Sequence, residues 1–238
     1  DGGRYAMGVA RQAGQPAGAV LAEHLADLIA GLSFGKSMRW NASGVTFSRP
    51  IRWLLALLGE QVVPFTYAGL ASGRTTYGLR PDGSPAIEVT SAENYPETLF
   101  QAQVLLDPTA RRVAIVEQID ALAAEVGGQV PDDPGLLEEV TYLVEQPNAL
   151  RGQFENKYLD LPRDLLVMVM RKHQRYFPVV SPSGELLPYF ISVRNGGEDH
   201  ETIVRHGNQE VVRARFADAA FFWQADTEEK LEAFLPRL

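Results

Sequence analysis

Five consecutive residues, Arg171-Lys172-His173-Gln174-Arg175, carry three cations and a histidine. Guanidinium and ammonium groups gathered this closely are suited to contact phosphate oxygens through charge-assisted hydrogen bonds. The same residues would also suit the C-terminal end of a helix, because the helix dipole favours positive charge there. The sequence leaves both interpretations open: a phosphate contact, or simple capping of a helix.

The hydrophobic pattern changes period on either side of this cluster. An apolar stripe at helical spacing runs through Leu165, Leu166, Val169 and Met170. Strand-like runs follow at 176–180 and 187–193, separated by the turn residues 181–184. The pattern therefore predicts a helix followed by a β-hairpin, with the basic cluster at the joint between them.

Two further cations, Arg213 and Arg215, lie in a second predicted helix over residues 201–223. Gly207-Asn208 is expected to kink or split this helix. Arg215 and Asp218 are three residues apart, so a surface ion pair worth a few tenths of a kcal/mol is the alternative to a ligand contact. The RNA-binding candidates are Arg171, Lys172, His173, Arg175, Arg213 and Arg215.

The remaining predicted elements alternate between helical and strand-rich stretches. Helices are predicted over 19–34, 91–100, 109–126 and 136–144, with Asp107 and Pro108 at the start of the third. Short strands are predicted over 38–77, where Gly59-Glu60 forms a two-residue hairpin turn, and at 104–105 and 150–154. The fold class predicted is α+β, with a mixed or antiparallel sheet and packed helices.

Composition and charge narrow the class of protein. Hydrophobic residues make up 45% and charged residues 22% of the 238 positions, which is typical of a soluble globular protein. The formal net charge of −8 disfavours a dedicated nucleic-acid binder. Residues 36–80, however, hold six Lys and Arg against one acid, with aromatics between them. Such strands can stack bases, or can simply be the two faces of a sheet.

Several kinds of chemistry are absent from the sequence. It has no cysteine, no P-loop, no dinucleotide-binding turn and no nucleophile elbow, and no two of its four histidines are three or four residues apart. No catalytic or metal-binding residue is therefore predicted. No apolar run has the ~20 residues of a membrane span, and no signal peptide is recognisable, so a cytoplasmic protein without membrane contact is expected.

The blocks around these features resemble one family in order along the chain. They are MRWNASGVTFSRPIRWLLALLGEQVVPF, ASGRTTYGLR, LLEEVTYLVEQPNALRGQFENKYLDLP, MRKHQRYFPVV, GELLPYFISVRN and GNQEVVRARFADAAFFWQADTEEKLEAFLPRL. Together they resemble the beta subunit of the bacterial, two-subunit type of glycyl-tRNA synthetase. The chain departs from the family pattern at Asn41, Tyr77 and Leu79. Losing two potentially cationic residues at the last two positions weakens an RNA contact there.

The resemblance implies a division of labour between two subunits. The alpha subunit would carry the class II active site, with its ATP and Mg²⁺, and the beta subunit would recognise and position tRNA-Gly. This chain would hold no cofactor. The resemblance also implies a likeness to the editing-type domain of the phenylalanyl-tRNA synthetase beta subunit. The expected organisation is an extended lead-in over 1–18, a core domain over 19–226, and a helix beginning at 227–238 that leads to HD-type and anticodon-binding domains beyond Leu238.

Three hypotheses follow for the role of the chain. The first is tRNA positioning by the six cationic candidates, without an aminoacylation site. The second is a scaffold or interaction module that contacts other domains or the alpha subunit and has no direct RNA contact. The third is an editing-type hydrolase with His173 as the base, for which the sequence specifies no nucleophile or partner carboxylate.

Overall fold

The computed structural model describes residues 8, 13–228 and 232, and the chain divides into two compact units. Unit 1 comprises residues 1–77 and 86–98, and unit 2 comprises 78–85 and 99–238. The domain limits expected from the sequence stay predictions. Most of the expected lead-in, and most of the helix expected over 227–238, fall outside the described residues.

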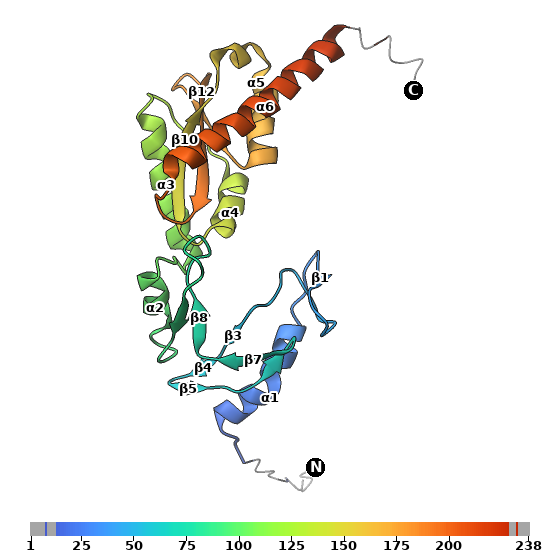
Figure 1. Ribbon diagram of the computed structural model, residues 1–238, viewed down its shortest axis with the longest axis vertical. Helices are drawn as coiled ribbons and strands as arrows, with labels where there is room; N and C mark the ends of the chain where they lie inside the picture. Colours follow the sequence, from blue (N-terminus) through green and yellow to red (C-terminus); the bar gives the residue numbers. More distant parts are fainter. Residues whose placement is uncertain (1–7, 9–12, 229–231, 233–238) are drawn as a thin grey trace, which may run out of the picture. The chain divides into compact units, whose positions relative to one another are not determined.

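Unit 1 is built from one helix and short strands (Figure 1). Helix α1 spans Ala17–Ala30. The strands are β1 (Met38–Arg39), β2 (Thr46–Phe47), β3 (Leu54–Leu55), β4 (Leu57–Leu58), β5 (Gln61–Val62), β6 (Thr66–Tyr67), β7 (Leu70–Gly73), β8 (Thr75–Tyr77) and β9 (Ala86–Glu88). All their pairings are antiparallel except that of β3 with β7. The hairpin predicted at Gly59-Glu60 is confirmed, because β4 pairs with β5 across it and Gly59 has a positive φ of 57°.

Unit 2 has a three-stranded antiparallel sheet as its framework. Its strands are β10 (Pro147–Gln153), β11 (Phe177–Val180) and β12 (Leu186–Asn195), in the order β10-β12-β11. The predicted hairpin is therefore confirmed as β11–β12. Leu105 donates its backbone N–H to the Glu145 carbonyl, but the strand predicted at 104–105 is wrong, since that stretch has no ladder.

Helices of unit 2 cover both faces of this sheet. The described helices are α3 (Pro108–Ala124), α4 (Pro134–Leu143), the 3₁₀-helix η1 (Asn156–Asp160), α5 (Arg163–Met168), the π-helix η2 (Val169–Gln174) and α6 (Glu201–Glu228). Helix α2 (Tyr95–Gln101) carries the chain from unit 1 into unit 2. The predicted kink is absent, because α6 continues through Gly207 and Asn208.

Successive side chains of a strand point to opposite faces of the sheet, and this produces two separate cores. Ile191 of β12 packs with α3 and α4, whereas the adjacent Phe190 packs with α5, η2 and α6. Both side chains are fully buried. Unit 2 is thus a helix–sheet–helix sandwich, which confirms the predicted α+β class. No described helix has the length and apolar character needed to cross a membrane.

Candidate functional site

The basic cluster lies on one continuous helical segment formed by α5 and η2. Its first turns are held by the buried Leu166 and Met170. From Val169 onward the helix widens to π geometry, which is rare and often occurs at functional sites. It ends at Arg175, whose left-handed backbone (φ 56°, ψ 39°) lets the Arg175 N–H reach the Arg171 carbonyl at 3.2 Å. The cations therefore lie at a helix C-terminus, at the joint between helix and hairpin that the sequence predicts.

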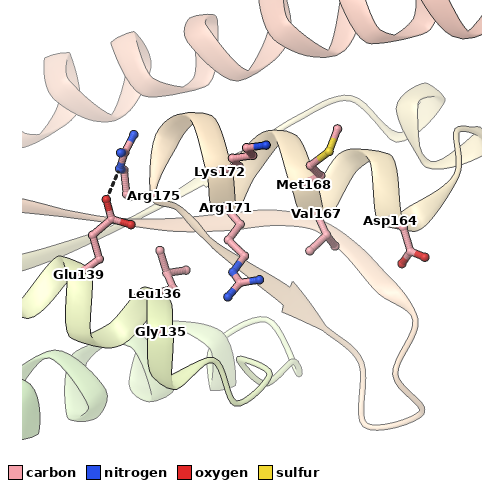
Figure 2. Close-up of a pocket in the computed structure, with 9 residues that line it drawn as sticks. All are labelled: Gly135, Leu136, Glu139, Asp164, Val167, Met168, Arg171, Lys172 and Arg175. Carbon is pink, nitrogen blue, oxygen red and sulfur yellow. Dashed lines mark hydrogen bonds and ion pairs between the residues drawn. The ribbon is translucent and has the colours of Figure 1, made fainter.

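A hollow of about 620 Å³ between α4 and the α5–η2 segment brings three of the candidates together. We call it the α4 hollow; Figure 2 shows the residues that line it. They are Gly135, Leu136, Glu139, Asp164, Val167, Met168, Arg171, Lys172 and Arg175. Its wall is thus part apolar and part charged, and the charges are of both signs.

Carboxylates from the α4 side hold two of these arginines. Arg171 forms a two-pronged contact with Asp133, in which Nη2 donates to Oδ1 at 2.7 Å and Nε contacts Oδ2. Arg175 donates from Nε to Glu139 Oε1 at 2.7 Å. The guanidinium groups are about half exposed, so water screens both pairs. The acids still compensate two of the three positive charges on this wall.

A second hollow, of about 350 Å³, lies on the other side of η2 and faces α6. In this α6 hollow, His173 and Arg215 lie with Asp218 and Asp226 beside the aromatic rings of Phe222 and Trp223. The Arg215–Asp218 ion pair considered from the sequence is not formed. No hydrogen bond joins His173 to either carboxylate among the residues that the structure describes, so a base–carboxylate pair is not assembled there.

Arg213 lines neither hollow. Its Nε lies 3.1 Å from Glu155 Oε1, and its Nη1 lies 3.0 Å from Glu210 Oε2. The six candidates thus divide into three arginines paired with acids (Arg171, Arg175, Arg213) and three residues that form no ion pair in the described part of the chain (Lys172, His173, Arg215).

Sequence reasoning missed the partners of the paired arginines. Asp133 is 38 residues from Arg171 along the chain, so no local spacing joins them. Tyr176, next to the cluster, stacks on Phe190 with 4.9 Å between the ring centroids. Burial raises the pKa of the Tyr176 hydroxyl above its ordinary value, so this group stays protonated at neutral pH.

The described residues contain no group of three or more histidines and carboxylates placed to hold a metal ion. The site offers cations, one imidazole, exposed aromatic rings and opposing carboxylates. Such a surface can bind an anionic polymer or a protein surface, and it has no nucleophile aligned with a base.

Comparison with known proteins gives one consistent result. A family model described as "Glycyl-tRNA synthetase beta subunit" matches residues 1–238. The chain is 48% identical over its whole length to the glycine–tRNA ligase beta subunit of Moorella thermoacetica, and covers 34% of that protein. It is 44% identical, again over its whole length, to the corresponding subunit of Syntrophotalea carbinolica. It is also 46% identical over 219 residues to glycine–tRNA ligase, chloroplastic/mitochondrial 2, of Arabidopsis thaliana, covering 20% of that protein. The chain spans about a third of the length of the bacterial relatives.

Proposed function

The chain belongs to the glycyl-tRNA synthetase beta-subunit family, and from this premise we propose that it supports the ATP-dependent attachment of glycine to tRNA-Gly. It does so by positioning the tRNA and by contributing to the architecture of the subunit, without an aminoacylation site of its own. The observation that carries this proposal is the family match over all 238 residues.

The alpha subunit is the proposed partner. It holds the class II active site, with ATP and Mg²⁺, and the two subunits act in the cytoplasm. The proposal includes a likeness of the core domain, residues 19–226, to the editing-type domain of the phenylalanyl-tRNA synthetase beta subunit.

The basic joint is the part of unit 2 proposed to contact tRNA. Lys172, His173 and Arg215 are free to meet phosphate oxygens, since none of them forms an ion pair within the described residues. Arg171 and Arg175 are already held by carboxylates, so a phosphate must compete with Asp133 and Glu139 for them. Phosphate groups of a polyanion compete well, because binding also releases condensed counterions.

The test replaces Arg171, Lys172, His173 and Arg175 together with glutamine in the full-length beta subunit, assembled with the alpha subunit. Affinity for tRNA-Gly is measured across a salt series. The variant is expected to bind more weakly, and the slope of log affinity against log salt is expected to flatten by about 2 to 3, since each phosphate contact contributes about 0.7 to 0.9.

A matched control removes four other cations of unit 2 that line neither hollow beside η2: Arg112, Lys157, Arg163 and Arg205. This control set changes the net charge by a similar amount. If both variants lose affinity equally, the effect is one of bulk charge, and the assignment of the joint fails. Unchanged binding by the joint variant also rejects it.

A second candidate function is a scaffold that contacts other domains or the alpha subunit without touching RNA. The observation that favours it is the apolar surface of α6, where Phe221, Phe222 and Trp223 are 69%, 60% and 44% exposed. Exposed aromatic clusters of this kind are typical of protein–protein contacts. Under this alternative, the joint variant would keep its tRNA affinity, whereas replacing the three aromatic residues would weaken association with the alpha subunit.

A further inference from the structure

Unit 1 carries a second basic surface with a different electrostatic character. Four cations, Lys36, Arg39, Arg49 and Arg52, are exposed, and none of them forms an ion pair among the described residues. In unit 2, by contrast, the arginines of the basic joint are held by Asp133 and Glu139. Unpaired cations that gather on one surface repel one another, so they cost stability unless a ligand neutralises them.

The β1–β2 hairpin gathers these charges. Its register pairs Met38 with Phe47 and Arg39 with Thr46. Lys36 and Arg49 lie in bends, each two residues outside the Met38–Phe47 pair, and Arg52 follows three residues later. Three of the four cations therefore lie within two residues of this short ladder, and their like charges repel one another unless an anion lies between them.

Aromatic contacts fix this hairpin in place. Phe34 packs edge-on against Phe47 with 4.6 Å between the ring centroids. The Trp40 indole N–H donates to the Phe47 carbonyl at 2.9 Å, and the Asn41 amide donates to the Ala68 carbonyl at 3.0 Å. Lys36, Arg39 and Arg49 thus belong to, or closely flank, an anchored element of unit 1.

Two tryptophans, each next in sequence to one of these arginines, keep part of their rings in solvent. Trp40 is 39% and Trp53 is 37% exposed. Trp53 packs against Tyr77 at 4.7 Å, and the Arg52 guanidinium lies 5.7 Å from the Trp53 ring centroid. A guanidinium over a ring still has N–H groups for phosphate, while exposed indole faces stack on unpaired bases.

We propose that this surface, formed by Lys36, Arg39, Arg49, Arg52, Trp40 and Trp53, binds the sugar-phosphate backbone of RNA and stacks its tryptophans on unpaired bases. We call it the hairpin surface. The inference rests on the proposed function, because tRNA is the RNA that a member of this family would meet. It places phosphate contacts in unit 1, where no carboxylate has to be displaced.

The experiment compares three variants of the full-length beta subunit with the alpha subunit present. One replaces Lys36, Arg39, Arg49 and Arg52 with glutamine, the second is the joint variant, and the third is the control set. Affinity for tRNA-Gly is measured across a salt series. The hairpin variant is expected to lose about tenfold or more in affinity, and its salt slope is expected to flatten by about 3. The control set is expected to change the affinity by no more than about twofold and the salt slope by less than about 1, since its charges make no phosphate contact.

The outcomes separate this inference from the proposed function. Loss of affinity in the hairpin variant, with or without a loss in the joint variant, supports the inference. Loss in the joint variant alone overturns the inference and leaves the proposed function standing. No loss in either overturns both. A hairpin variant that keeps its tRNA affinity but dissociates from the alpha subunit identifies an acidic protein surface as the partner, which also overturns the inference.

Stacking is tested separately by fluorescence. The full-length beta subunit is compared with a variant that carries Trp40→Phe and Trp53→Phe, and the difference between the two emissions reports on these two rings. A short unpaired RNA is expected to quench this emission, and Trp53→Leu to remove part of the quenching. An RNA duplex without unpaired bases is expected to quench less. Equal quenching by both RNAs would overturn the stacking part of the proposal. Unchanged circular dichroism of each variant controls for folding.

Discussion

Asp133 connects local structure to the candidate site through one carboxylate. Its Oδ1 accepts the Leu136 N–H at 3.0 Å and so caps the first turn of α4. The same carboxylate also receives the guanidinium of Arg171. A cap and an ion pair on one side chain respond differently to substitution, because asparagine retains the capping oxygen and loses the negative charge.

Asp133→Ala is expected to lower the free energy of unfolding by about 1–2 kcal/mol from the lost cap, and by up to about 1 kcal/mol more from the half-exposed ion pair. Asp133→Asn is expected to cost less than about 1 kcal/mol, since Asn is an equally good cap. Urea denaturation measures both. Equal losses in the two variants would mean that the charge, and not the cap, stabilises this end of α4.

At the scale of single residues, the sequence predicted local contacts and missed distant ones. The cap of α3 was predictable because Asp107 directly precedes Pro108 and Thr109, and its carboxylate accepts the Thr109 N–H at 2.9 Å. The Arg175–Glu139 pair joins residues 36 positions apart, and only the tertiary placement of Arg175 opposite α4 creates it. The composition of the basic joint was therefore predictable, but the partial neutralisation of its charge was not.

Elements were predicted well where one physical signal dominates. The change from period 3.6 to period 2 located the β11–β12 hairpin, and the apolar stripe located α5. The π-helix at Val169–Gln174 was not predicted, because a shift from i+4 to i+5 hydrogen bonding leaves the residue pattern nearly unchanged. The expected break at Gly207 failed since a single glycine costs only about 1 kcal/mol in a 28-residue helix.

Two glycines in unit 2 are expected to respond to alanine with opposite signs. A Cβ on Gly152 of β10 would lie 2.2 Å from Cζ of the buried Phe190, whereas a Cβ on Gly207 of α6 meets nothing within 4 Å. Gly152→Ala is expected to destabilise by about 1–3 kcal/mol through overpacking. Gly207→Ala is expected to stabilise by about 0.5–1 kcal/mol, because glycine is the more flexible residue in the unfolded chain. Thermal unfolding of both variants measures the sign of each change in stability. A stable Gly152→Ala variant would mean that the β10–β12 contact can relax.

At the scale of the whole molecule, burial is unequal between the two units. Both clusters of buried apolar residues lie in unit 2. The fully or nearly fully buried apolar side chains of unit 1, among its described residues, are Val63 and Val89, and α1 buries none of its side chains. This difference in burial was not predictable from the sequence, because the apolar stripe of α1 resembles that of a helix that packs against another element.

Hydrogen exchange should follow this difference in burial. The amides of β10 and β12, which share seven paired positions, are expected to exchange only through global unfolding. Those of the two-residue ladders β1–β2 and β4–β5 are expected to exchange through local opening, at least tenfold faster, since few buried apolar contacts oppose it. Mass spectrometry of peptides from the full-length subunit, with and without tRNA-Gly, measures both rates. Equal protection of both units without tRNA would mean that unit 1 is stabilised by surfaces of the subunit that cover α1.

The same measurement tests the hairpin surface. If it binds RNA, tRNA should slow exchange in peptides covering 36–53 and leave exchange in β10 and β12 unchanged.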